Sequence, residues 1–291
     1  MADNWTSLGV SVAEDFDWLE QSYCRGQLVH CTTNGSDVSD EESFGATETI
    51  WIITSCILIF QMQTGFGLLE AGSVTAKSET NIMVKNSLDL VFGGITYWAF
   101  GFACSFGDSP GDNPFIGVGH YFLVVDEKRM GYVYALFLFQ LSFATTSMTI
   151  VSGAMAERAR LISYNIFSMC MTFIYAVPAH WMWAPNGFLL SLGVQDIAGC
   201  GPVHLVGGMT GLVATLMLGP RKGAFDGNRG TVPSPLKSIL GMFMLWWGWL
   251  RFNSGSVYIV TADDQWRFAV IAGVNTIIAS ISGGVTSVIC R

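Results

Sequence analysis

Seven long apolar segments constrain the fold of this 291-residue chain more than any other feature. Each is close to the ~20 residues that an α-helix needs to cross the hydrocarbon core of a bilayer. Of all residues, 51% are hydrophobic and only 12% are charged, and the 33 glycines suit helices that approach one another closely in lipid. The sequence therefore predicts an all-α integral membrane protein. The predicted spans are residues 49–70, 87–107, 131–153, 162–184, 200–218, 238–256 and 268–290.

The distribution of basic residues predicts how the chain is oriented in the membrane. If the amino terminus is outside, the inner loops carry nine Lys or Arg residues and the outer loops carry five. Cytoplasmic loops of membrane proteins are enriched in Lys and Arg, so this asymmetry favours an external amino terminus. We therefore expect a multi-pass plasma-membrane protein with an extracellular amino-terminal tail.

The predicted extracellular tail, residues 1–47, is acidic and carries two N-glycosylation sequons. It holds nine Asp or Glu residues against the single Arg25. The sequons begin at Asn4 and Asn34, and no other Asn in the sequence starts one. The net charge of −8 comes largely from this tail, and nothing in the sequence indicates nucleic-acid binding. A cleaved signal peptide is not indicated, so the first span is expected to direct its own insertion.

The cysteines and histidines give no sign of a metal or a cofactor. Cys24 and Cys31 lie in the predicted tail, where an oxidising compartment allows a local disulfide. No Cys-x-x-Cys or His-x-x-x-His pair is present, and no catalytic pattern recurs at helical spacing. We therefore expect neither an enzyme nor a cofactor site. The cysteines in or beside apolar segments are expected to be small buried hydrophobic residues, and they are Cys56, Cys104, Cys170, Cys200 and Cys290.

An acid and a histidine accompany the fifth apolar segment. Asp196 precedes this segment, and His204 lies about four residues inside it. Ionisable groups at membrane depth mark pathways for polar solutes, because every unpaired polar atom in lipid costs several kcal/mol. Asp196 is placed to accept N–H bonds from the turn around Gly199 and Gly201, which favours a structural role. His204 packs against a neighbouring helix or lines a pathway, and we favour the pathway because a neutral imidazole offers one donor and one acceptor.

Aromatic residues form a second group of candidates. Phe143, Trp183 and Phe252, with Ser256 one turn after Phe252, fall near the external ends of predicted spans or near mid-depth. Each ring alone is typical of an interfacial belt or of packing. Together they indicate a vestibule in which aromatic rings replace part of the hydration shell of a cation.

Four motifs occur in a fixed order along the chain. They are Gly65-Phe66-Gly67-Leu68-Leu69-Glu70-Ala71-Gly72, Ala156-Glu157-Arg158, Asp196-Ile197-Ala198-Gly199 with Val203-His204, and Phe252-Asn253-Ser254-Gly255-Ser256. In order and spacing they resemble the ammonium transporter (Amt/Mep/Rh) family from residue 44 to residue 290. The presence of Trp183 makes the chain more similar to the Amt branch than to the Rhesus glycoproteins. The resemblance implies a transmembrane domain over residues 48–291, a trimer with one pore per subunit, and eleven helices in an inverted five-plus-five repeat.

The resemblance also implies a role for each candidate residue. His204 matches the first of two pore histidines, and Asp196 matches the acid that supports cation recruitment. In the implied mechanism, ammonium binds outside, loses a proton near a phenylalanine gate, and crosses as ammonia along the histidines. Potassium can neither lose a proton nor donate a hydrogen bond, so selectivity rests on that chemistry. The residues that match the external cation site and the gate are Phe143, Trp183, Phe252 and Ser256.

Two features depart from the family pattern. Arg251 stands where the family usually has a small residue, and its charge would repel ammonium unless it is paired or turned toward the interface. The sequence also stops at Arg291, after the seventh predicted span and before the position of the second pore histidine. We therefore expect an apparently truncated member that does not conduct on its own. The expected substrate is ammonium or ammonia, and the chain lies in the lipid bilayer. We expect it to assemble as a homotrimer or with full-length relatives. The alternative function is a non-conducting subunit or ammonium sensor that co-assembles with those relatives.

Overall fold

The computed structural model describes residues 45–225, 234–261 and 264–290. Within these ranges the chain is helical and forms no β-strand, which confirms the predicted fold class. The sequons at Asn4 and Asn34 and the cysteines Cys24 and Cys31 lie outside the described residues.

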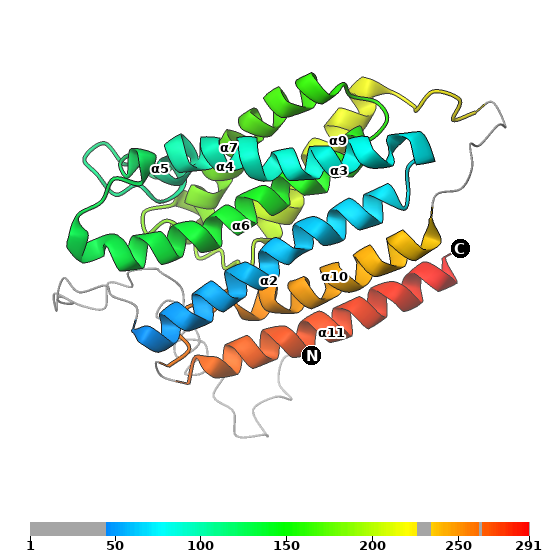
Figure 1. Ribbon diagram of the computed structural model, residues 1–291. Helices are drawn as coiled ribbons and strands as arrows, with labels where there is room; N and C mark the ends of the chain where they lie inside the picture. Colours follow the sequence, from blue (N-terminus) through cyan, green and yellow to red (C-terminus); the bar gives the residue numbers. More distant parts are fainter. Residues whose placement is uncertain (1–44, 226–233, 262–263, 291) are drawn as a thin grey trace, which may run out of the picture.

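Seven long helical segments make up the described part of the chain (Figure 1). Six of them are long and apolar enough to cross a membrane. The seventh long helix is α10, which carries Lys237, Arg251 and several tryptophans. The segments are α2 (Ala46–Ala71), the run from α3 (Glu79–Leu88) through α4 (Gly94–Thr96) to α5 (Phe102–Phe106), α6 (Met130–Met155), α7 (Leu161–Trp183), α9 (Val206–Leu218), α10 (Pro235–Ser254) and α11 (Trp266–Ile289).

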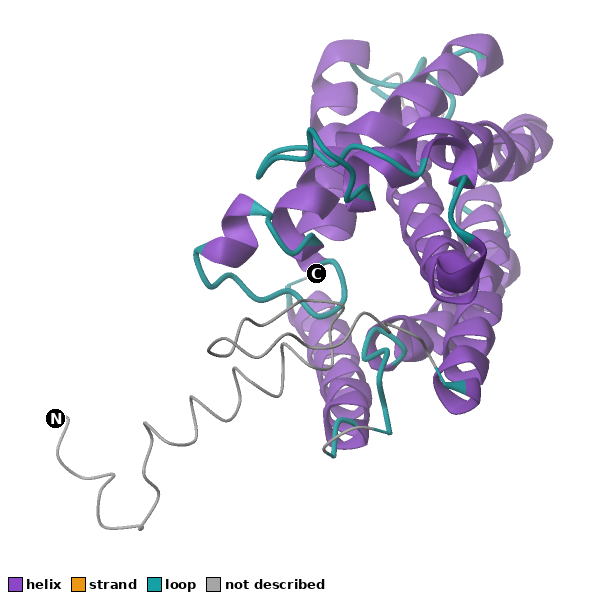
Figure 2. Cartoon of the chain, turned by 90° about the vertical axis from the view of Figure 1, so that its left-hand side faces the viewer, coloured by secondary structure: helices purple, strands orange, loops and turns teal. Residues whose placement is uncertain are grey.

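Successive long helices run in opposite directions, so the connections gather at two ends of the bundle (Figure 1). The end where α2 begins faces the viewer in Figure 2 and holds residues 107–129, 184–199 and 255–261. The opposite end holds residues 72–78, 156–160 and 219–225. We refer to these as the first end and the second end.

Helix α6 lies at the centre of the bundle, and most of its side chains are buried. It packs against α2 and α9, whereas α2 packs most extensively against α10, and α11 covers the outer side of α10. The exposed side chains of α9, α10 and α11 are largely aliphatic, for example Leu216, Ile239 and Ile278. Such surfaces are typical of helices that face lipid.

The second helical segment starts earlier than the apolar pattern predicts, near residue 76 rather than 87. Its first turns contain Lys85 and Asp89, which are fully buried. The Lys85 ammonium donates to the Ala159 carbonyl at 3.0 Å and lies 5.2 Å from the centre of the Tyr164 ring. Asp89 accepts a hydrogen bond from the Tyr164 hydroxyl at 2.7 Å. Lys85 is therefore not a loop residue, and the predicted inner count of basic residues falls from nine to eight.

The expectation that all five membrane cysteines are buried is wrong for three of them. Cys56 and Cys104 are buried, whereas Cys170, Cys200 and Cys290 are exposed on the bundle surface. A thiol is only weakly polar, so an outward position toward lipid costs little.

Candidate functional site

Two stacked phenylalanine rings connect α6 and α10. Phe143 lies midway along α6, and Phe252 lies near the end of α10. Their ring centres are 4.0 Å apart and their planes differ by 13°. Both side chains are almost completely buried, so the pair forms an apolar barrier inside the bundle.

Trp183, the last residue of α7, stands edge-on to Phe143. The ring centres are 5.9 Å apart with an interplanar angle of 70°. The indole Nε1 donates to the backbone carbonyl of Asp196 at 2.7 Å, which fixes the orientation of the ring. The face of a tryptophan ring attracts cations, so a fixed indole beside the barrier is suited to hold one.

The side chain of Asp196 organises the loop that leads into α9. Its Oδ1 accepts the backbone N–H groups of Ala198 at 3.2 Å, Gly199 at 2.7 Å and Cys200 at 3.0 Å. Its Oδ2 accepts the N–H of Gly201 at 2.7 Å. A carboxylate with four N–H partners holds the backbone of this turn. Through its backbone carbonyl, Asp196 also holds the indole of Trp183.

The loop enters the helix through Gly199. This residue has a φ of 82°, in the left-handed region that favours glycine. A Cβ at this position would lie 2.7 Å from the Val203 side chain and 3.2 Å from that of Trp183. The Gly199 carbonyl accepts the N–H groups of Val203 and His204, both at 3.1 Å. This turn therefore begins the π-helical segment Cys200–Leu205, which carries His204 into the bundle.

The imidazole of His204 packs against Phe252. The ring centres are 5.4 Å apart and the planes meet at 50°. The residue is partly buried, and within the described ranges its ring nitrogens make no hydrogen bond to the protein. Trp183, Phe143, Phe252 and His204 thus form a continuous row of ring contacts, which we call the aromatic row.

The side chains of Arg251, just before Phe252, and Ser256, one turn after it, point in different directions. The buried Ser256 hydroxyl donates to the Phe252 carbonyl at 2.7 Å, one turn away. The Arg251 guanidinium stacks on the ring of Trp51, with 3.6 Å between Cζ and the ring centre. Its Nη2 donates to the Trp51 carbonyl at 3.1 Å and to the Thr54 hydroxyl at 2.9 Å. Arg251 is therefore turned toward α2, where a ring stack and two hydrogen bonds hold its guanidinium.

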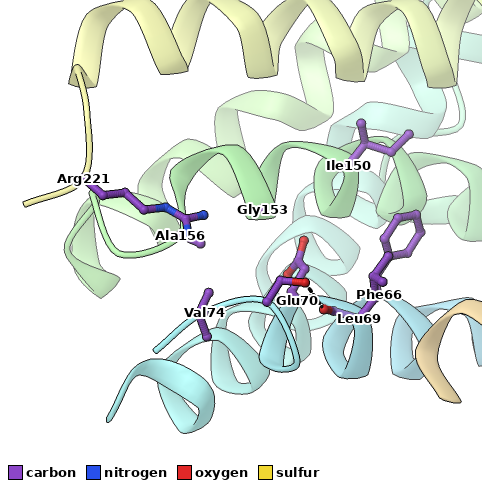
Figure 3. Close-up of a pocket in the computed structure, with 9 residues that line it drawn as sticks. Phe66, Leu69, Glu70, Val74, Ile150, Gly153, Ala156 and Arg221 are labelled. Carbon is purple, nitrogen blue, oxygen red and sulfur yellow. Dashed lines mark hydrogen bonds between the residues drawn. The ribbon is translucent and has the colours of Figure 1, made fainter. Parts of the chain in front are cut away.

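One buried acid near the second end received no role from the sequence. Glu70 is 9% exposed in the last turn of α2, where its oxygens accept hydrogen bonds from Asn86 and Ser152. It lines a cavity of about 320 Å³ together with Phe66 and Arg221 (Figure 3). The sequence did contain a signal, because an acid inside a predicted span marks a functional position by default.

Comparison with known sequences identifies the family. Residues 50–291 match the sequence profile of the Ammonium Transporter Family. A Caenorhabditis elegans relative named as an ammonium transporter is 47% identical over 270 residues, which are 89% of this chain and 39% of the relative. Ammonium transporter 1 member 3 of Solanum lycopersicum is 40% identical over 266 residues, which are 83% of this chain and 56% of the relative. The chain spans about half the length of the curated relatives it matches.

Solved structures agree with this assignment. The "Sensor Amt Protein" has a TM-score of 0.73 and 30% identity over 83% of this chain and 61% of that chain. Candida albicans Mep2 has a TM-score of 0.65 and 30% identity over 80% of this chain and 54% of that chain. The family is named for transport and not for an enzymatic reaction, as the sequence indicates. The chain is a multi-pass membrane protein that belongs to the Ammonium Transporter Family.

Proposed function

We propose that the protein moves ammonium across the plasma membrane, with the aromatic row as the outer part of the pathway. The observation that carries this proposal is the sequence of contacts from Trp183 through Phe143 and Phe252 to His204. A cation-attracting ring, an apolar barrier and a polar ring with open nitrogens follow one another there. Membership of the family and the names of the relatives support ammonium as the substrate.

The proposed pathway begins with ammonium at Trp183 and Phe143. Their rings replace part of the hydration shell of the ion, and Ser256 and Asp196 support the site. A charged ion is expensive to carry past the buried phenylalanine pair, so the ion releases its proton to water before this barrier. Ammonia then continues along His204, whose ring provides one donor and one acceptor. Potassium is excluded because it has no proton to release and no N–H to donate.

The position of the protein in the cell follows from the charge pattern. The acidic segment 1–47, with sequons at Asn4 and Asn34, faces the extracellular side, and residues 48–291 form the transmembrane domain. The first end of the bundle is then the outer end, and the second end is cytoplasmic. We propose that subunits assemble as a homotrimer or together with full-length relatives.

A pair of adjacent substitutions tests the transport proposal. In a yeast strain that lacks its own ammonium transporters, the full-length protein, meaning this chain extended by the remaining helices of the family repeat, is expected to support saturable uptake of ¹⁵N-ammonium that potassium does not inhibit. His204→Ala removes the polar ring and should abolish most of this uptake at equal surface abundance. Leu205→Ala is the matched control, because Leu205 is 62% exposed on the bundle surface. Equal uptake by both variants would contradict a pathway along His204.

A sensor function is the second candidate, because the structural neighbour with a TM-score of 0.73 is named as a sensor. A sensor binds ammonium at the aromatic row and passes a signal to a partner without net transport. The same yeast assay separates the two functions, since a sensor gives ammonium-dependent binding without uptake.

A further inference from the structure

The Glu70 cavity lies near the second end, on the far side of the phenylalanine pair from Trp183. It opens between α2 and α6, and its α6 wall includes Ile150 and Gly153, which follow Phe143 by two and three helical turns (Figure 3). Gly207, about one turn beyond His204 on α9, also approaches this wall: a Cβ there would lie 3.0 Å from the Ile150 side chain. The cavity and the turn that carries His204 therefore share one wall.

The carboxylate of Glu70 keeps part of its acceptor capacity free. Its Oε2 accepts from the Asn86 amide at 2.6 Å, and its Oε1 accepts from the Ser152 hydroxyl. Two carboxylate oxygens offer about four lone-pair positions; Asn86 and Ser152 take two of them, and the backbone of Gly153 also interacts with the carboxylate. Among the described residues, no basic side chain forms an ion pair with Glu70. The buried Lys85 ammonium acts on Glu70 through its charge but does not contact it, so the carboxylate has no cation at hydrogen-bond distance and can accept one.

Asn86, which donates to Glu70, carries an unused acceptor of its own. Asn86 is 4% exposed, and its Oδ1 has no hydrogen-bond partner in the described part of the chain. Rotation of the amide would not help, because it would set Oδ1 against the Glu70 oxygen that now accepts from Nδ2. The buried pair of Glu70 and Asn86 thus lacks N–H or O–H donors rather than acceptors.

Asp89 shows how a buried acid in this bundle is satisfied by the protein alone. It accepts from the Tyr164 hydroxyl at 2.7 Å and from the Ser168 hydroxyl at 2.9 Å, and it does not line the cavity. Two hydroxyl groups from α7 enclose it. Glu70 differs because it borders an open volume.

Arg221 lines the same cavity but does not neutralise Glu70. It lies beside Ala156, at the end of the cavity away from Phe66 (Figure 3). Its Nη1 lies 3.2 Å from Oε2 of Glu157, so its charge is already paired. The cavity therefore has an ion-paired Arg221 at its rim and, deeper inside, a carboxylate that no cation contacts directly.

We propose that Glu70 holds an ammonium ion at an inner station, on the opposite side of the phenylalanine barrier from Trp183. The ion forms when ammonia that has passed the barrier takes up a proton from water, and its N–H groups donate to the Glu70 carboxylate, which lines the cavity. This inference rests on the proposed function, since it adds a second cation site to the same pathway. It assigns a ligand to a carboxylate that the outer mechanism does not use.

Infrared difference spectroscopy on the purified full-length protein in liposomes tests this site. Exchange of sodium chloride for ammonium chloride at equal ionic strength should change a carboxylate band. The change should shift when glutamate side chains carry ¹³C, and it should be lost in Glu70→Gln. Glu79→Gln is the matched control and should keep the change, because Glu79 is paired with Lys237 away from the cavity.

Several results would overturn the inner station. They are the absence of a glutamate-dependent change in the unaltered protein, an equal change with potassium chloride, or retention of the change in Glu70→Gln. Glu70→Asp keeps a carboxylate that the glutamate label does not mark. If Glu70→Gln does not fold, this variant decides the matter, because the ¹³C-sensitive change should be lost from it and its retention would overturn the proposal. If the Glu70 band does not respond while Trp183-dependent ammonium binding is intact, only this inference fails. If both the Glu70 band response and Trp183-dependent ammonium binding are absent, the proposed function fails as well.

Discussion

At the residue scale, the side chains of the aromatic row are held in place by groups that do not belong to the row. The carbonyl of Asp196 fixes the Trp183 indole, while the carboxylate of Asp196 is fixed by four backbone N–H groups. Such preorganisation lets an aromatic site bind a cation without first paying to order the rings. The sequence predicted that Asp196 accepts the N–H groups of Gly199 and Gly201, and the structure confirms this. It did not predict the bond from the Trp183 indole to the Asp196 carbonyl.

Arg251 contributes to the packing of α10 against α2. Arg251→Met keeps an unbranched side chain but removes the guanidinium stack on Trp51 and the bonds to α2. We expect a loss of stability of about 1–2 kcal/mol, visible as a lower thermal unfolding temperature in detergent. The ammonium affinity should not change. An improved affinity at low salt that vanishes at high salt would show that the guanidinium acts on the site after all.

At the element scale, the sequence predicted the long helices well because lipid demands about 20 apolar residues per crossing. It failed at the start of the second segment, where the partners of Lys85 and Asp89 come from the region of Ala159 and Tyr164. Those partners are distant in sequence, so a local pattern counts the charges as loop residues. The stacking of Phe143 on Phe252 likewise depends on tertiary packing, and only the family resemblance pointed to it.

Two glycines in the loop before α9 have the same φ, so substitutions at both can distinguish backbone strain from steric crowding. Gly199 and Gly193 both have a φ of 82°, but only Gly199 is crowded, by Val203 and Trp183. Gly193→Ala should cost about 1–2 kcal/mol, the penalty of the left-handed region. Gly199→Ala should cost more and should also weaken ammonium binding, because Trp183 must move. Thermal unfolding of both variants checks this, and equal losses would argue against the crowding.

Glu157 joins three connections at the second end. It has a φ of 60° and accepts from the N–H of Thr75 at 3.0 Å and from the Thr75 hydroxyl, and it pairs with Arg221 at 3.2 Å. Its neighbour Arg158 donates to the Gly219 carbonyl at 3.1 Å. These contacts link residues 72–78, 156–160 and 219–225, so the motif Ala156-Glu157-Arg158 has a structural explanation.

The Glu157 contacts predict a pH dependence of stability. Burial raises the pKa of Glu157, but the hydrogen bonds from Thr75 and the charge of Arg221 outweigh burial and leave this pKa below its ordinary value of 4.5. A lowered pKa in the folded state contributes stability above the unfolded pKa, and this contribution is lost as the pH falls through the folded pKa. Unfolding temperatures measured from neutral to acidic pH should therefore drop more steeply in the unaltered protein than in Glu157→Gln. Parallel curves would contradict this assignment.

At the scale of the whole molecule, seven alternating helices place residue 45 and residue 290 at opposite ends of the bundle (Figure 1). The charge asymmetry predicts which end is outside, and it survives the reassignment of Lys85 to the second helical segment. If the first end is extracellular, deglycosylation of protein made in eukaryotic cells should reduce its mass. The double change Asn4→Gln and Asn34→Gln should abolish that shift. A tail reached by protease only from the cytosol would reverse the orientation and place Trp183 on the inner side.

Cation binding at the aromatic row is the central claim, and equilibrium dialysis of ¹⁵N-ammonium against the purified full-length protein tests it most directly. We expect saturable binding of ammonium. Trp183→Leu should weaken the affinity by about 2- to 30-fold, the equivalent of a cation–π contact of roughly 0.5–2 kcal/mol. Trp247→Leu should leave it unchanged, because Trp247 is 59% exposed on the outside of α10. No saturable binding, or the same affinity in both variants, would contradict an ammonium site at Trp183.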